Sequence, residues 1–177
     1  MTRTVYYTAT SLDGFIADPD NSLDWLITRD TDQDGPMGYG QFIAGVGALA
    51  MGATTYLWVR EHDPEWVPER PAWVFTHRDL PPLPKADLRF TAGDVAGVHA
   101  AMVEAAAGRD VWVVGGGDLA GQFADAGLLD EVVVAVAPVT LGGGAPLLPR
   151  RLELEVREFA RNGEFTCVRY DVRRPPS

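Results

Sequence analysis

The chain has 177 residues, enough for one domain with a sizeable hydrophobic core. Hydrophobic residues make up 46% of it and charged residues 23%, a balance typical of folded globular proteins that excludes a disordered chain. The formal net charge of -10 disfavours nucleic acids and anionic membrane surfaces as partners. An anionic ligand must therefore be held by local groups, such as backbone amides or a single arginine.

The sequence contains no apolar run near the roughly 20 residues that a transmembrane helix needs. The N-terminal segment lacks the apolar stretch and the small-residue cleavage site of a secretory signal. Cys167 is the single cysteine, so no internal disulfide can form. Together these features predict a cytoplasmic protein. The histidines at 62, 77 and 99 show no metal-ligand spacing, and no metal site is expected.

Strand-like and helix-like segments alternate along the chain. The first strand is predicted over residues 4–11 and ends at an Asp-Gly turn. In chain order, the end of a helix is expected at 42–46, then a strand at 48–51, a helix at 54–61, strands at 72–76 and 88–91, a helix at 95–107, a strand at 111–114, a helix reaching 126, and a strand at 131–139. The last two strands, 153–160 and 165–172, form an antiparallel pair that turns at Asn162-Gly163. With no repeat and no long linker, we expect a single α/β domain over residues 1–177.

The most informative segment is VWVVGGGDLAGQF, residues 111–123, where a buried strand runs into three glycines and a helix. Glycine has no Cβ, so its backbone can take positive φ and lie against a ligand. A helix N-terminus presents free N–H groups and partial positive charge, which suits a pyrophosphate. The alternative is that the glycines only permit a tight turn between strand and helix.

Gly115, Gly117 and Ala120 also fit the G-x-G-x-x-A fingerprint of a Rossmann domain. That fingerprint belongs to the first strand-helix unit and needs an acidic residue at the end of the next strand. Here the motif comes late in the chain, and Asp130 and Glu131 stand at the beginning of the next strand. An ordinary Rossmann domain is therefore not expected.

Three segments in order carry a family resemblance: SLDGFIA (11–17), MGATTY (51–56) and VVGGGDLAGQF…GLLDEVVVAVAPVTLGGGAPLL (113–148). The chain resembles the dihydrofolate reductase-like superfamily, and it is most similar to the C-terminal reductase domain of the riboflavin-biosynthesis protein RibD and its stand-alone relatives. The resemblance implies a three-layer α/β fold with a mixed, mostly parallel central sheet flanked by helices. It also implies NADPH as cofactor, with the nicotinamide near the first strand and the pyrophosphate between two helix N-termini.

The resemblance assigns cofactor-binding roles by matching position. The nicotinamide side would be lined by Ala9, Ile16 and Ala17, and the phosphates would meet Thr54 and Thr55 at the second helix. The adenosine ribose and its 2′-phosphate would lie near Thr76, His77 and Arg78. The pyrophosphate would be cradled from the other side by Gly115, Gly116, Gly117, Asp118 and Leu119.

One position departs from the family pattern. The family usually reads MGRxT, whereas this chain has Ala53 where that arginine would stand. A charge-assisted hydrogen bond is worth about 1.5–3 kcal/mol, or roughly tenfold to a hundredfold in affinity. Arg78 could supply the cation instead, but the expected preference for NADPH is weakened and NADH becomes an alternative cofactor.

Three further residues have two interpretations each. Asp13 is a candidate catalytic residue that polarises a substrate, or it caps the Asp-Gly turn. Trp25 is a candidate for stacking on a planar substrate, or it anchors a loop beside Leu23 and Leu26. Gly143 would shape part of the substrate pocket, or belong to a simple loop.

The leading hypothesis is an NAD(P)H-dependent oxidoreductase that transfers hydride to a C=N or C=O bond of a small heterocyclic substrate. The nearest activity in the family is 5-amino-6-(5-phosphoribosylamino)uracil reductase of riboflavin biosynthesis. One alternative is dihydrofolate reductase activity, although no proton-donor motif for a pterin is recognisable. A second alternative is a non-catalytic nucleotide-binding or dimerising protein. The long apolar strand and the family resemblance suggest a homodimer, and the negative net charge predicts that it binds neither nucleic acid nor membrane.

Overall fold

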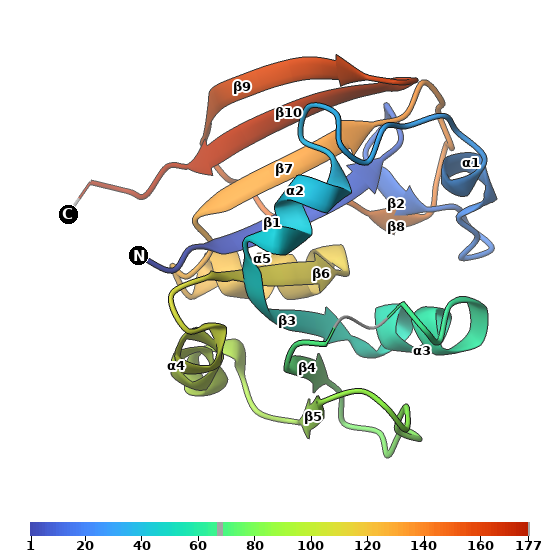
Figure 1. Ribbon diagram of the computed structural model, residues 1–177. Helices are drawn as coiled ribbons and strands as arrows, with labels where there is room; N and C mark the ends of the chain where they lie inside the picture. Colours follow the sequence, from blue (N-terminus) through green and yellow to red (C-terminus); the bar gives the residue numbers. More distant parts are fainter. Residues whose placement is uncertain (67–68, 177) are drawn as a thin grey trace.

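A computed structural model describes residues 1–66 and 69–176 of the chain. Its centre is an eight-stranded sheet in the order β5-β4-β3-β6-β1-β7-β10-β9 (Figure 1). The strands of this sheet are β1 (Thr4–Thr10), β3 (Val46–Gly52), β4 (Ala72–Phe75), β5 (Leu88–Thr91), β6 (Asp110–Gly115), β7 (Glu131–Val136), β9 (Leu154–Asn162) and β10 (Phe165–Val172). The six strands from β5 to β7 are parallel, and the β9–β10 hairpin adds to β7 in antiparallel fashion. This confirms the predicted mixed, mostly parallel sheet.

Helices cover both faces of the sheet, which gives the predicted three layers. The helices are α1 (Asp24–Ile27), α2 (Tyr39–Ala44), α3 (Ala53–His62), α4 (Val95–Ala106) and α5 (Gly117–Asp125). The side chains of β6 alternate between the faces: Val111 and Val113 pack with α4 and α5, whereas Trp112 packs with α2 and α3. Because successive side chains of a strand point to opposite faces of the sheet, a nearly all-apolar strand can pack into a hydrophobic cluster on each face.

Several predicted boundaries were wrong. The strand expected at 153–160 is β9, which reaches Asn162, so the hairpin turns at Gly163-Glu164 and not at Asn162-Gly163. The helix expected at 42–46 is α2, which ends at Ala44, and Val46 is already the first residue of β3. The strand expected to reach Val139 ends at Val136. Pro138 has no amide hydrogen and therefore cannot continue the ladder of hydrogen bonds.

A second, two-stranded sheet lies beside the carboxyl end of β1 and was not predicted. It pairs β2 (Phe15–Ala17) with β8 (Ala145–Pro146) in antiparallel fashion. The Tyr6 hydroxyl fixes the segment after β8 by donating a 2.8 Å hydrogen bond to the carbonyl of Leu147. Both strands are too short for a periodic sequence signal, and only tertiary contacts define them.

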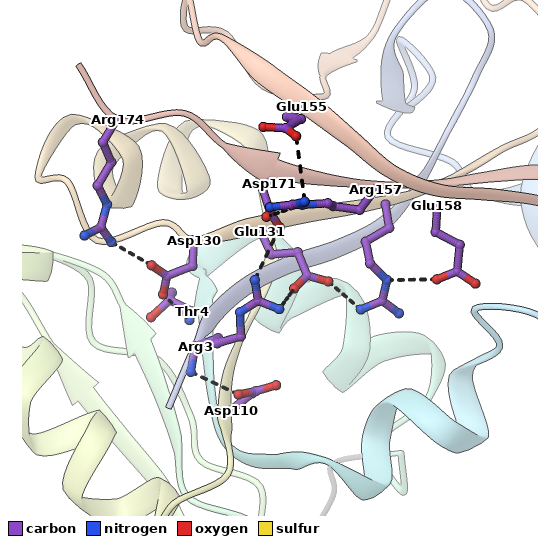
Figure 2. A network of polar contacts seen from close by, with 11 residues as sticks. Arg3, Thr4, Asp110, Asp130, Glu131, Glu155, Arg157, Glu158, Asp171 and Arg174 are labelled. Atoms are coloured by element: carbon purple, nitrogen blue, oxygen red, sulfur yellow. Dashed lines mark hydrogen bonds and ion pairs between the residues drawn. The ribbon is translucent and has the colours of Figure 1, made fainter. Parts of the chain in front are cut away.

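A network of ion pairs crosses the sheet at the amino ends of β1 and β7 (Figure 2). Glu131 is 1% exposed and lies between two arginines: Arg3 Nη1 is 2.6 Å and Arg169 Nη1 is 2.5 Å from its carboxylate oxygens. Asp171 joins the network through Arg3 and Arg157. A buried carboxylate needs such partners because its desolvation is otherwise costly. The network ties β1, β7, β9 and β10 together.

Among the helices of the described residues, none has the length and apolar character that crossing a membrane requires.

Candidate functional site

A cavity of about 880 Å³ lies where β1, β3 and β6 end. Figure 1 shows these carboxyl ends on the side of the sheet where α1, α3 and the β2–β8 pair also lie. In open α/β sheets, ligands bind beyond the carboxyl ends of parallel strands, because the loops and helix N-termini there can face one another.

Two helix N-termini meet in this cavity, and both lack a side-chain cap. Gly52 precedes α3 and Gly116 precedes α5, and neither position provides a side-chain oxygen to the first turn. Within residues 1–66 and 69–176, the first three amides of each helix, 53–55 and 117–119, donate no hydrogen bond. By contrast, α4 lies outside the cavity, and its Asp94 side chain accepts a 2.7 Å bond from the Gly97 amide. Uncapped amides at two facing N-termini form a site suited to an anion.

The three glycines of the run have different roles. Gly115 has φ +148°, a conformation that favours glycine, and its peptide bond to Gly116 is cis. A Cβ on Gly116 would meet only Ile16 Cδ1, at 3.7 Å, so this backbone is bare toward the cavity. A Cβ on Gly117 would lie 2.2 Å from the carbonyl oxygen of Pro146. Gly116 therefore allows a ligand to approach, whereas Gly117 allows the segment after β8 to pack.

Asp118 places a negative charge beside this site. Hydrogen bonds from Gln122 and Arg150 keep the pKa of its carboxyl below the usual value, so the group is ionised at neutral pH. A carboxylate in the first turn of α5 is stabilised by the helix dipole. Its side chain is 70% exposed and is neutralised in part by Arg150, at 3.1 Å.

The other end of the cavity is aromatic. Trp112 is at its centre, with its ring 5.6 Å from that of Trp66 and 5.9 Å from that of Tyr39. The indole of Trp112 donates a 3.0 Å hydrogen bond to the carbonyl of Tyr7, which fixes its orientation. Burial raises the pKa of Tyr7 to about 12 and also raises the pKa of Tyr39, so both phenols are neutral. The wall formed by Tyr7, Tyr39, Trp58, Trp66 and Trp112 is called the aromatic end below.

Most of the predicted cofactor-binding residues line this cavity together: Ala9, Ile16, Ala17, Thr54, Thr55, Gly115, Gly116, Gly117, Asp118 and Leu119. The predicted adenosine group, Thr76, His77 and Arg78, lies just beyond the lining, which includes the preceding residue, Phe75. Its role stays a prediction.

The three remaining predicted residues lie outside the cavity lining. Trp25 packs against the core beneath α2, and its indole donates a 3.0 Å bond to the Ser22 carbonyl, as expected of a loop anchor. Gly143 lies in the loop before β8, where a Cβ would meet Pro19 at 3.6 Å. Asp13 accepts hydrogen bonds from Ser11 and from the amides of Leu141 and Gly142.

These bonds to Asp13 favour a structural role over a catalytic one. The Ser11 hydroxyl, at 2.6 Å, and the two amides lower the pKa of the Asp13 carboxyl from 3.8 to about 2. The group is therefore ionised at neutral pH and cannot donate a proton. It connects the loop after β1 to the loop after β7, a long-range contact that neither sequence-based interpretation of Asp13 expected.

The aromatic end was missed by the sequence analysis, although part of it had a signal. Tyr7 lies two residues before Ala9 and therefore on the same face of β1. Trp58 lies four residues after Thr54 on α3, again on the same face. No local pattern places Trp66 or Tyr39 there, because they follow irregular segments.

Comparisons with known proteins agree on one family. The model of the RibD C-terminal domain matches residues 4–167. Over 173 residues, the chain is 33% identical to the uncharacterized protein YwjB of Bacillus subtilis, covering 95% of this chain and 97% of that protein. These matches confirm the resemblance found in the sequence.

Solved structures show the same fold. A Shewanella sp. PV-4 protein, whose name relates it to riboflavin biosynthesis, has a TM-score of 0.82 and 28% identity, covering 98% of this chain and 100% of that one. A pyrimidine reductase-like protein from Corynebacterium diphtheriae has a TM-score of 0.66 at 14% identity, covering 98% and 93%. The Thermotoga maritima diaminohydroxyphosphoribosylaminopyrimidine deaminase/5-amino-6-(5-phosphoribosylamino)uracil reductase has a TM-score of 0.66 at 16% identity, and the match covers 97% of this chain and 56% of that one.

Proposed function

Because the chain belongs to the RibD C-terminal domain family, we propose that it is a reductase that uses a reduced nicotinamide dinucleotide to reduce a C=N or C=O bond of a small heterocyclic molecule. The observation that carries this proposal is the pair of uncapped helix N-termini, α3 and α5, that face one cavity around the bare backbone of Gly116.

The residues present fit a dinucleotide. Its diphosphate would accept hydrogen bonds from the free amides of residues 53–55 and 117–119, with the hydroxyls of Thr54 and Thr55 as further donors. The two N-terminal dipoles supply the positive potential that a chain of net charge -10 otherwise lacks. Gly116 allows the diphosphate to approach the backbone closely, since a side chain at this position would occupy the same space.

The small apolar residues near β1 and β2 would hold the nicotinamide ring. Ala9, Ile16 and Ala17 line the cavity between the glycines and the aromatic end. When bound, the reduced nicotinamide supplies a hydride. The chain's part is to hold the acceptor against the ring and to exclude water, which lowers the entropic barrier of the transfer. Asp13 is ionised and engaged by amides, so we expect the accompanying proton to come from water.

Titration with NADPH and with NADH tests the binding step. Three of the five tryptophans, Trp58, Trp66 and Trp112, line the cavity, so a bound nicotinamide should quench the protein fluorescence. Oxidation of the dinucleotide, followed by its near-ultraviolet absorbance, is then measured with a panel of pyrimidines, pterins and carbonyl compounds. The proposal fails if neither dinucleotide binds. Binding without oxidation across the panel would instead indicate a non-catalytic nucleotide-binding protein, and turnover confined to dihydropterins would indicate dihydrofolate reductase activity.

A further inference from the structure

The charges of the cavity are distributed unevenly between its two ends. Among the described lining residues, the only charged side chains are Asp118, beside the glycines, and Asp63, at the aromatic end. No lysine, arginine or histidine lines the cavity in the described part of the chain, and Val67 and Pro68, outside that part, are uncharged. An anion at the glycine end can still use free helix amides. The aromatic end has no comparable donors.

The orientation of α3 further favours an anion at the glycine end of the cavity over one at the aromatic end. Its N-terminus lies at the glycine end, whereas its last turns, with Trp58, Val59 and the C-cap Asp63, line the aromatic end. The C-terminus of a helix carries partial negative charge. The Asp63 carboxylate adds a full negative charge there, which is opposed in part by Arg70, whose charge acts on the Tyr39 phenol as that of Asp63 does, and by Arg60 and His62 in the last turn of α3. Both contributions disfavour an anion at this end.

A second hollow beside the main cavity is acidic as well. It measures about 420 Å³ and is lined by Asp20, Asp24 and Glu61, and the residues that it shares with the main cavity are Asn21, Leu23, Ile27, Thr54 and Trp58. His62 is the one basic side chain among its described lining residues, and its ring stacks on Trp58 at 4.6 Å. A phosphate that extends from the main cavity in this direction would therefore meet three more carboxylates.

From this arrangement we infer that the acceptor bound at the aromatic end is a planar heterocycle without a phosphate group, either uncharged or cationic. The partly exposed rings of the aromatic end provide stacking and edge contacts for a flat ring, and Trp112, only 4% exposed, packs against them and holds them in place. The inference rests on the proposed function, since it assigns the second ligand of the same site. It separates this chain from reductases of phosphoribosylated substrates, the kind named for the Thermotoga protein.

Matched pairs of ligands test the inference. Riboflavin, pyridoxine and thiamine are each titrated against their monophosphates, with NADP⁺ in excess so that the amides at the glycine end are occupied. Tryptophan fluorescence and calorimetry report binding. In every pair that binds, the free form should bind about tenfold or more tightly, the effect of one close carboxylate at intermediate dielectric. The inference is overturned if a monophosphate binds as tightly as its free form, or if no member of any pair binds.

Reversing the charge of Asp63 tests whether this carboxylate causes the preference for ligands without a phosphate group. Asp63→Lys should raise the affinity for the monophosphates relative to the free forms by about tenfold. The matched control is Glu104→Lys, an exposed position on α4 outside the cavity lining, which makes the same change in net charge and should leave the ratio unchanged. Equal effects of the two variants would contradict the assignment to Asp63. The NADP⁺ titration of the same samples keeps the two proposals apart: loss of NADP⁺ binding counts against the proposed function, whereas a preference for monophosphates with NADP⁺ bound counts against the substrate class alone.

Discussion

Adding one methyl group at Gly116 or at Gly117 should have opposite consequences for binding and for stability. In Gly116→Ala, the new Cβ would meet only Ile16 Cδ1, at 3.7 Å, so the protein can fold around it. The methyl group would, however, occupy the space where the proposed diphosphate approaches the backbone. In Gly117→Ala, the new Cβ would lie 2.2 Å from the Pro146 oxygen and 2.5 Å from the Leu147 oxygen, and backbone has to move.

The magnitudes follow from these contacts. A hydrogen bond from an amide to a charged group contributes about 1.5–3 kcal/mol, so losing one such bond in Gly116→Ala should weaken NADPH binding by roughly tenfold to a hundredfold. Overpacking costs about 1–3 kcal/mol or more, so Gly117→Ala should lower the free energy of unfolding by at least that amount. For a protein of this size, each kcal/mol shifts the melting temperature by about 2–4 °C.

Fluorescence titration with NADPH and thermal unfolding followed by circular dichroism measure the two effects on the same samples. The control is Gly45→Ala, at the C-cap of α2, where a Cβ would meet one carbonyl oxygen at an ordinary 3.6 Å. The reasoning is refuted if Gly116→Ala unfolds cooperatively with native circular dichroism and still binds NADPH with wild-type affinity. In that case the diphosphate, if bound at all, does not contact this backbone.

Three further variants test the cofactor preference, the ion-pair network and the loop connection. Ala53→Arg should tighten NADPH binding relative to NADH by about tenfold or more, because it restores a charge-assisted hydrogen bond at the start of α3; an unchanged ratio of the two dissociation constants would contradict this. Glu131→Gln should lower the free energy of unfolding by about 3 kcal/mol, the low end for a broken buried pair because its two arginine partners are partly exposed. Chemical denaturation measures this loss, and a change below about 1 kcal/mol would show that the network contributes only as surface pairs do. The lowered pKa of Asp13, about 2 against 3.8, means that its stabilisation is present above the ordinary value and is lost as pH falls through about 2. The protection factors of the Leu141 and Gly142 amides, measured by NMR, should therefore be lower in Asp13→Asn than in the wild type at neutral pH, and those of the wild type should fall only near pH 2. Equal protection factors in both proteins at neutral pH would rule out the connection.

Much of the fold was predictable because its signals are local. The β6-glycine-α5 unit follows from a run of apolar residues, three glycines and a helical segment that are adjacent in sequence. The β9–β10 hairpin follows in the same way from two neighbouring strands, although its turn lies at Gly163-Glu164, one residue later than predicted. The glycine-lined half of the cavity was also largely predictable, because Thr54 and Gly116 lie at strand-to-helix junctions, which a sequence shows directly.

The aromatic end as a whole and the hydrogen bonds of Asp13 could not be predicted from the sequence. Trp66 reaches the cavity from the irregular segment after α3, and its contact with Trp112 joins residues far apart in sequence. Asp13 and Gly142 are 129 residues apart, and nothing near Asp13 indicates which amides its carboxylate will meet. The presence of carboxylates near the aromatic end likewise depends on which distant residues line the same cavity.

For this chain, the amino-acid sequence alone determined where strands and helices alternate, that a glycine immediately precedes each of the two helices at the candidate site, and which family the chain resembles. The order of strands β3, β6 and β1 in the sheet, and with it the meeting of two helix N-termini and an aromatic wall in one cavity, was decided only by the tertiary structure. The reason is physical: backbone preferences and side-chain periodicity act over a few residues, whereas strand order and the contacts at strand ends come from burial and pairing between distant segments.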